Sequence, residues 1–305
     1  MLKQFNLIKS RVVESPDQQG DILLYINPTE AEKKDLVEKL HIDEHTLVSA
    51  LDPDELSRIE FEPDHLAVIF KRPRQFSADD NRLLFRVSST GLFLFGDRLV
   101  IVMLEDLPLF DSRLFQRIST LSDVALKLIY RSIFHFLEHL KVVNMISDDL
   151  ERKINASMDN RYIIHLFGLE KSLVYYLNSI NSNGALIEKL RLNSSKLHFT
   201  PDQAEFIDDM IIENTQCYKQ AEIHSNILAS LMDARASIVG NNLNVLMKNL
   251  TLITIGIMVP TFVVSAFSMN VRIPMSDIHH AFWFILLLAL LSMASFFLIW
   301  RHKHW

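Results

Sequence analysis

The chain has 305 residues, of which 37 are acidic and 31 are basic, and its formal net charge is −6 at pH 7. Nucleic-acid binding calls for a clustered basic surface, so this charge balance argues against a nucleic-acid partner. A single cysteine, Cys217, excludes intramolecular disulfides and cysteine-cluster zinc sites, and it suits a reducing cytosol.

Residues 1–120 predict a cytosolic α+β domain. Asn27 followed by Pro28 is typical of a helix start with proline at the first helical position, and apolar spacing continues to about Leu40. Short stretches rich in β-branched and aromatic residues predict strands at 21–26, 65–71, 82–87, 91–95 and 99–104. Gly96 and Asp97 supply a hairpin turn between the last two strands. The N-terminus carries no apolar run of signal-peptide length, so we expect this domain to stay in the cytosol.

Residues 121–200 predict a helical hairpin, because glycine and proline almost vanish from this part of the chain. Its two helices are expected at about 122–156 and 162–195, with the polar stretch 157–160 at the tip of the hairpin.

A stalk helix is predicted over residues 201–248. Thr200, Pro201 and Gln203 form a strong helix-start motif, and the chain then continues without a strong helix breaker. A seam at steps of three and four residues is apolar at Ile207, Met210, Cys217, Ala221, Leu228, Leu231, Ile238 and Val245, and polar at Asn214, His224, Arg235 and Asn242. The imperfect seam is equally consistent with packing on the helical hairpin of the same chain and with packing against copies of the chain.

Two uncharged, strongly apolar runs, 249–271 and 281–300, predict an integral membrane protein. Each run has at least the roughly 20 residues that a helix needs to cross a hydrocarbon core of about 30 Å. The predicted order is a first span at 249–270, an external loop at 271–280, a second span at 281–300 and a cytosolic basic tail at 301–305. Lys248, Arg301 and Lys303 flank the spans on one side, against Arg272 in the loop, so both termini are expected in the cytosol.

The first span and the residues that lead into it carry polar or polarisable groups on one face. These groups are Asn244, Met247, Thr251, Thr254 and Met258, at steps of three and four residues. An oligomer would turn this stripe into rings around a pore, because two helices alone cannot enclose one. Threonine in a membrane span also commonly bonds back to its own backbone, so composition leaves both interpretations open.

The end of the first span resembles the CorA-type magnesium transporter family, which carries Gly-Met-Asn where this chain has Ser268, Met269 and Asn270. The resemblance extends over essentially the whole chain. It implies a CorA-like fold, in which an α+β cytosolic domain with a long helical stalk precedes a C-terminal two-helix transmembrane hairpin. It also implies passive Mg²⁺ transport across the plasma (inner) membrane through a homo-oligomeric channel, expected to be a pentamer, that is gated by intracellular metal.

The resemblance assigns an ion path to the first span. The family's stalk enters the membrane through an Asn, a Met, a Leu and a second Met, which Asn244, Met247, Leu250 and Met258 match here. Mg²⁺ dehydrates reluctantly, so amide oxygens of Asn244 and Asn270 would hydrogen-bond the water shell of a hydrated divalent cation. The apolar side chains would form a constriction that gates by dewetting. Ser268 in place of glycine adds a Cβ and a hydroxyl, and is expected to shape the external turn differently.

The resemblance also implies a regulatory metal site. Asp233 stands where relatives have an aspartate that binds magnesium between neighbouring subunits, and Asp52 and Asp54 are the candidate partner carboxylates. Carboxylates held near one another repel when metal is absent and are bridged when it is present, so bound Mg²⁺ would hold the closed state.

Three other interpretations remain open. The chain could carry zinc, cobalt or nickel within the same superfamily, or it could be a non-conducting membrane sensor or scaffold with this fold. A membrane-tethered enzyme would need a catalytic constellation, which the sequence does not offer. The chain also has no phosphate-binding glycine loop, so transport is expected to be passive.

Overall fold

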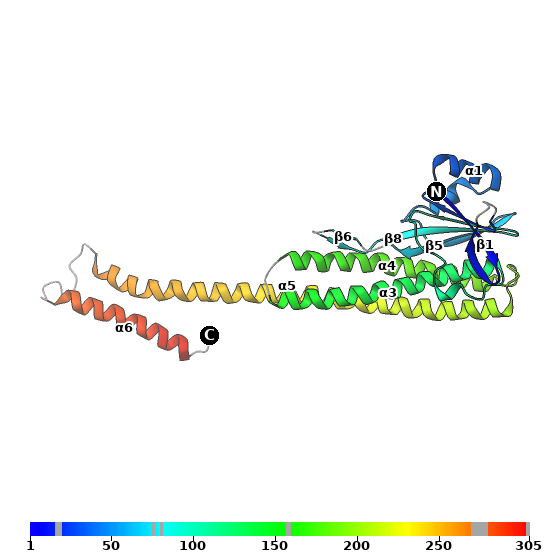
Figure 1. Ribbon diagram of the computed structural model, residues 1–305. Helices are drawn as coiled ribbons and strands as arrows, with labels where there is room; N and C mark the ends of the chain where they lie inside the picture. Colours follow the sequence, from blue (N-terminus) through cyan, green and yellow to red (C-terminus); the bar gives the residue numbers. More distant parts are fainter. Residues whose placement is uncertain (16–19, 75–76, 80–81, 157–159, 270–279, 303–305) are drawn as a thin grey trace. The chain divides into compact units, whose positions relative to one another are not determined.

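The computed structural model describes residues 1–15, 20–74, 77–79, 82–156, 160–269 and 280–302 (Figure 1). The chain divides into two compact units, Met1–Met232 and Asp233–Trp305. We describe each unit by itself.

A seven-stranded sheet with the order β2-β1-β3-β9-β8-β5-β4 forms the N-terminal part of the first unit. Its strands are β1 Leu2–Ile8, β2 Arg11–Glu14, β3 Ile22–Ile26, β4 Arg58–Phe61, β5 His65–Pro73, β8 Val87–Phe95 and β9 Leu99–Met103, while β6 Ser77–Asp79 and β7 Arg82–Leu84 form a separate hairpin. Strands β3 and β9 pair in parallel, and the other neighbours in the sheet are antiparallel. The α+β prediction is confirmed.

The structure corrects one strand prediction and adds strands that were not predicted. The expected strand 82–87 is the end of one hairpin, β7, followed by the start of β8. Strands β1, β2 and β4 were not predicted, because their residues are mostly only partly buried and so lack a strong apolar pattern. The predicted hairpin turn at Gly96 and Asp97 is confirmed by the antiparallel pairing of β8 with β9.

The sheet is covered on both faces. Helices α1 Glu30–Leu40 and α2 Glu44–Ser49 pack on one face, and the long helices pack on the other (Figure 1). The strands β5, β8 and β9 are therefore almost continuously buried. Such a sandwiched sheet gives the first unit a continuous buried core.

Helix α1 begins two residues later than the Asn27-Pro28 pattern predicted. Thr29 is the N-cap, its hydroxyl accepting a hydrogen bond from Glu32 N–H at 3.3 Å, and the Glu32 carboxylate accepts one from Thr29 N–H at 2.8 Å. This reciprocal capping box satisfies two backbone donors, which outweighs the preference of proline for the first helical position. Pro28 therefore precedes the helix.

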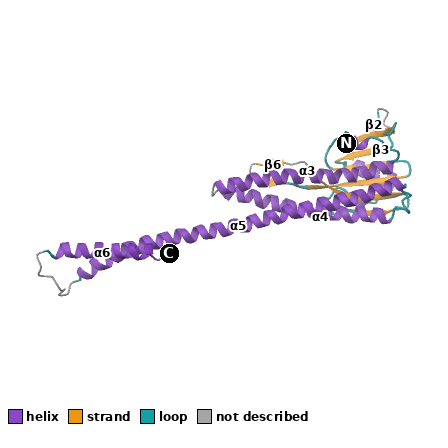
Figure 2. Cartoon of the chain, turned by 90° about the horizontal axis from the view of Figure 1, so that it is seen from below, coloured by secondary structure: helices purple, strands orange, loops and turns teal. Residues whose placement is uncertain are grey.

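The long helices of the first unit run side by side (Figure 2). They are α3 Leu121–Ala156, α4 Asn160–Leu192 and the first part of α5 Pro201–Phe267, and a short 3₁₀ helix, η1 Arg113–Phe115, precedes them. The predicted start of α5 is confirmed, because Thr200 N–H donates to Gln203 Oε1 at 3.0 Å and Gln203 N–H donates to Thr200 Oγ1 at 3.3 Å.

The first part of the predicted seam packs on helices of the same chain. Its buried members are Ile207, Met210, Cys217, Ala221 and Leu228. The polar interruption at Asn214 is also buried, and its Nδ2 donates to Ile180 O in α4 at 3.0 Å. Further along, Ile238 and Val245 are 44% and 47% exposed, so the described part of the chain does not bury this end of the seam.

The second unit contains the rest of α5 and helix α6, Ala281–His302. Among the described residues, both helices hold stretches long and apolar enough to cross a membrane. They meet at Gly256, where an added Cβ would lie 3.9 Å from ring atoms of Phe296 and Phe297. The less exposed positions of α6 recur at helical spacing and are Ala281, Ile285, Leu288, Ala289, Ser292 and Phe296. The predicted two-helix hairpin is therefore present in the fold.

Candidate functional site

The predicted ion-path residues lie together on one exposed face of α5. We call this set the pore stripe, and it comprises Asn244, Met247, Leu250, Thr251, Thr254 and Met258. Met247 and Met258 are 60% and 62% exposed. In a helix, residues three and four apart share a face, so the spacing read from the sequence produces this continuous stripe.

Helix α6 covers a different face of α5. The covered residues are Leu252, Gly256, Val259 and Val263, all less exposed than their neighbours in the pore stripe. At 3.6 residues per turn, the centre of this covered face lies roughly 140° around the helix from the centre of the pore stripe. The second helix of the hairpin therefore leaves the pore stripe open.

The two threonines of the pore stripe bond to their own helix. Thr251 Oγ1 donates to Met247 O and Thr254 Oγ1 donates to Leu250 O, both at 2.8 Å. Backbone bonding, one of the two interpretations open from the sequence, is thus observed. It leaves the oxygen lone pairs available, and the outward-pointing O–H groups of a hydrated cation require such acceptors. Bonding to the backbone and lining of an ion path can therefore both apply to Thr251 and Thr254.

Ser268 follows the C-terminal end of α5 directly. Its hydroxyl donates to Ser265 O at 2.9 Å, and its backbone N–H donates to the same oxygen at 3.1 Å. Of the non-glycine residues that the structure describes, six have positive φ, and Ser268 is not among them. Its backbone therefore does not require glycine. Met269 is exposed, and Asn270, the third member of the motif, lies outside the described residues.

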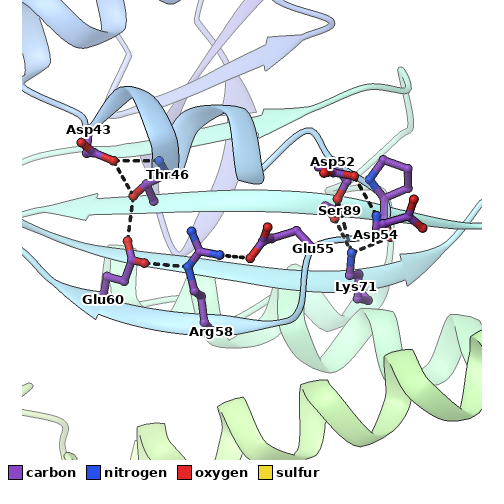
Figure 3. Close-up of polar contacts among 10 residues, drawn as sticks. Asp43, Thr46, Asp52, Asp54, Glu55, Arg58, Glu60, Lys71 and Ser89 are labelled. Atoms are coloured by element: carbon purple, nitrogen blue, oxygen red, sulfur yellow. Dashed lines mark hydrogen bonds and ion pairs between the residues drawn. The ribbon is translucent and has the colours of Figure 1, made fainter.

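Asp52 and Asp54 lie in the loop between α2 and β4 (Figure 3). The Asp52 carboxylate accepts a hydrogen bond from Asp54 N–H at 2.9 Å, which closes a tight local turn. The loop is tied to the sheet beneath it by Lys71 in β5, whose Nζ donates to Pro53 O at 2.7 Å, to Asp52 O at 3.3 Å and to Ser89 Oγ at 2.8 Å. The carboxylates of this loop are consequently presented from a fixed backbone.

Burial lowers the pKa of Lys71 to about 8, and the nearby charges of Asp52, Asp54 and Glu55 oppose that shift. The loop comes close to the sheet because β8 has Gly91 here. A Cβ on Gly91 would meet the Ala50 Cβ at 2.5 Å, which is too near for any side chain. Lys71 and Gly91 therefore set the position of the acidic loop.

A second network of hydrogen bonds and ion pairs lies beside the loop and includes the acidic residues Asp43, Glu55 and Glu60 (Figure 3). The Asp43 carboxylate caps α2 by accepting from Thr46 N–H at 2.9 Å, and the Thr46 hydroxyl donates to Glu60 at 2.7 Å. Arg58 then bonds Glu60 at 2.6 Å and also pairs with Glu55. Glu55 and Glu60 thus share one arginine, whereas Asp52 and Asp54 remain exposed at the surface.

The predicted regulatory residues are brought together only in part. Asp52 and Asp54 are neighbours in the first unit, whereas Asp233, also exposed, begins the second unit. Within the described ranges, no group of three or more histidine, cysteine, aspartate or glutamate residues is placed to hold a metal ion. A metal site built from these three aspartates therefore stays a prediction.

These observations define a class: a membrane protein with a soluble sheet-and-helix unit and a C-terminal hairpin of two apolar helices, the first of which is uncovered on its polar face. Residues 17–302 match the model of a family described as CorA-like Mg²⁺ transporter protein. The match covers most of the sequence, and the chain belongs to this family.

Individual relatives agree with this assignment. The chain is 24% identical over 293 residues to the cobalt/magnesium transport protein CorA of Methanocaldococcus jannaschii, with 92% of this chain and 89% of that protein covered. The complete structure of the CorA magnesium transporter from Methanocaldococcus jannaschii superposes with a TM-score of 0.81 at 20% identity, covering 98% of this chain and 96% of that one. The full-length CmaX protein superposes with a TM-score of 0.70 at 16% identity, covering 100% and 97%. At these identities the structural similarities establish the fold.

Proposed function

We propose that the protein transports divalent cations, Mg²⁺ foremost, passively across the plasma (inner) membrane through a homo-oligomeric channel lined by the pore stripe. One observation carries the proposal: α6 packs on a face of α5 away from the pore stripe, which leaves the polar positions free to face a symmetry axis. The name of the Methanocaldococcus jannaschii relative, a cobalt/magnesium transport protein, supports the same ions. The protein would act as a transporter and not as an enzyme.

The chemistry of the pore stripe suits an ion that keeps its water shell. Asn244, Thr251 and Thr254 would accept hydrogen bonds from first-shell waters, and Asn270 would do so at the outer entrance. Met247, Leu250 and Met258 would narrow the path with apolar side chains, which hold back ions until the path is wetted. Five copies, the number expected from the family resemblance, would surround the path.

Regulation by intracellular metal is part of the same proposal. With both termini in the cytosol, Asp52 and Asp54 would meet the cytosolic pool of Mg²⁺. Their loop is fixed to the sheet through Lys71, so the carboxylates can meet Asp233 of a neighbouring copy with little loss of conformational entropy. Mg²⁺ bridging these carboxylates would hold the channel closed.

Growth of an uptake-deficient host on low magnesium tests the transport. We expect the chain to restore growth, and the Asn270→Ala variant to restore it poorly. Membrane-inserted, folded protein that restores uptake of neither Mg²⁺ nor Co²⁺ nor Ni²⁺ would refute the proposal. Excess Mg²⁺ should compete with any zinc uptake if magnesium is the preferred ion, and the absence of competition would indicate a zinc transporter instead.

Ser268→Gly separates a transporter from a non-conducting scaffold. Ser268 has no positive φ that glycine would relieve, and its hydroxyl contributes a single hydrogen bond of about 1 kcal/mol. We therefore expect the original protein and the Ser268→Gly variant to give equal Mg²⁺ flux when each is reconstituted in liposomes. Flux gained only after the substitution would favour the scaffold.

A further inference from the structure

A cavity of about 740 Å³ lies in the first unit, between the sheet and α3. Its walls come from β5, β8 and β9, from the segment that contains η1, and from α3. Binding sites for small organic molecules typically enclose about 300–1,000 Å³, so this cavity has the volume for one. It is separate from the pore stripe and from the acidic loop at Asp52.

Arg72 of β5 forms part of the cavity wall and is 5% exposed. Its Nε donates to Thr90 Oγ1 at 3.2 Å, and its Nη2 reaches Glu105 at 3.4 Å. Its Nη1 is buried and has no hydrogen-bond partner among the residues that the structure describes. A buried guanidinium with an unused donor is costly, because an arginine has only donors and cannot lose its proton. An acceptor placed in the cavity would remove that cost.

Two further donors face the same space. Arg131 of α3 is half-buried and lines the cavity, with its Nη1 donating to Leu109 O. Ser112, just before η1, has a buried Oγ that also lacks a partner within the described part of the chain. Donors from β5, α3 and the η1 segment thus converge on one cavity although they are far apart in sequence.

The charges around the cavity favour an anion. Glu105 is shared between Arg72 and Arg74, and its charge is therefore offset by both. Glu138 is exposed, so water screens its charge. The pKa of His135, on the same wall, is lowered to about 4 by burial first and then by the charges of Arg72 and Arg131. His135 is neutral at pH 7, and the remaining buried charge is positive.

Much of the remaining wall is apolar. Phe70, Ile101, Leu107 and Leu128 line the cavity beside the two arginines. An inorganic anion would fill only a small part of this volume and would leave the apolar wall in contact with water. A ligand with one anionic group and an apolar body satisfies both parts of the site.

We propose that this cavity binds a small organic anion, with a carboxylate or phosphate group on Arg72, Arg131 and Ser112 and an apolar body against Phe70, Ile101 and Leu128. Guanidinium groups bind both oxyanions through paired N–H donors. The site is independent of the proposed transport, and its occupancy does not require any metal.

Fluorine NMR on the full-length protein in lipid nanodiscs tests the site directly. The probes are 4-(trifluoromethyl)benzoate, 4-(trifluoromethyl)phenyl phosphate and, as a neutral analogue, 4-(trifluoromethyl)benzyl alcohol. We expect line broadening beyond that in empty nanodiscs for at least one anion and none for the alcohol. The arm that binds more tightly identifies the carboxylate or the phosphate as the anionic group. Equal broadening by the alcohol, or none by either anion, would overturn the proposal, as would inorganic phosphate that competes at the affinity of the aromatic anions.

Variants locate the binding. Arg72→Met should weaken the bound anion at least about tenfold, since it removes a charged hydrogen-bond donor. Arg98→Met is the matched control, because it removes a partly exposed arginine that pairs with Asp97 and does not line the cavity, and it should leave affinity unchanged. Ser112→Phe fills the cavity without touching either arginine's charge and should abolish binding, which keeps the test valid if Arg72→Met fails to fold. Unchanged affinity in Ser112→Phe would contradict the location.

Discussion

The two ends of α5 carry similar apolar spacing but differ in what covers it. In the first unit, Met210 is fully buried against the other helices of its own chain, and the polar side chain of Asn214 finds a partner there. In the second unit, Met247 is 60% exposed and Asn244 is exposed as well. One helix thus contains a segment whose apolar residues are buried by other helices of the same chain and a segment whose apolar residues remain exposed.

This difference in burial implies different constraints on the side chains of the two segments. A buried seam is constrained by volume, because interiors are close-packed and every lost methylene leaves a gap. An exposed row of large apolar side chains in a single chain points to a surrounding partner, and the proposed function predicts lipid or further copies of the chain in that place. Matched substitutions at the two ends can therefore separate stability from transport.

The largest effect is expected for the pair Met210→Ala and Met247→Ala. Truncating a buried methionine costs about 2–5 kcal/mol through lost burial and the cavity it leaves, whereas the exposed methionine costs little. Hydrogen exchange of the full-length protein in nanodiscs should show loss of protection in α4 and the first part of α5 for Met210→Ala only. Mg²⁺ flux should change in Met247→Ala while its protection stays unchanged. Equal losses of protection would show that both segments are buried alike.

Acidification should destabilise the first unit. Burial, before any charge effect, lowers the pKa of His135 and of His139 to about 4, so the folded state holds both neutral. The unfolded chain takes up these protons below its own pKa of about 6.5, so their full contribution to stability is present above pH 6.5 and is lost as the pH falls towards 4. Allowing for solvent screening, we expect a loss of about 1 kcal/mol per histidine.

Thermal unfolding between pH 7 and pH 4 measures this effect. His135→Gln should flatten the dependence of the melting temperature on pH, because it removes one of the two buried imidazoles. A melting temperature that is independent of pH over this range would contradict the assignment of neutral, buried imidazoles.

A smaller difference is expected between Asn214→Ala and Asn244→Ala. Removing Asn214 loses its bond to Ile180 O inside the helical layer, at a cost of about 1 kcal/mol. Asn244 is exposed in the pore stripe, so its removal should leave unfolding unchanged and lower Mg²⁺ flux. Urea unfolding followed by hydrogen exchange, together with liposome flux, distinguishes the two. A stability loss in Asn244→Ala would place that residue in a packed interface.

Local patterns predicted the helices well and the sheet less well. The start of α5 was predicted because Thr200 and Gln203 bond to each other within one turn. Strand β5 was predicted to end at Lys71, yet it continues to Pro73, because Ser89, Thr90 and Glu105 from other strands and loops supply hydrogen-bond partners to the buried side chains of Lys71 and Arg72. Such non-local partners cannot be read from a single segment.

In the candidate site, too, the features set by local sequence were predicted and those set by contacts between distant segments were not. Helical periodicity alone placed Asn244, Thr251 and Met258 on one face, and the structure confirms that placement. Which face α6 covers depends on Gly256, whose role emerges only from its contacts with Phe296 and Phe297. The arginine-lined cavity was missed entirely, because its donors come from three separate segments.

The smallest effect is expected from alanine in place of two glycines, Gly184 in α4, which contacts the buried segment of α5, and Gly240 in α5 itself. At Gly240 an added Cβ meets nothing within 4 Å, so Gly240→Ala should stabilise α5 by about 0.5–1 kcal/mol through helix propensity. At Gly184 the Cβ would meet Asn214 Nδ2 at 2.9 Å, and moving that amide weakens its bond to Ile180 O, so Gly184→Ala should give no net gain. Hydrogen exchange around residues 184 and 240 measures both. Loss of Mg²⁺ flux in Gly240→Ala, with its helix more protected, would mean that transport requires α5 to bend at this glycine and that the two segments differ in motion as well as in burial.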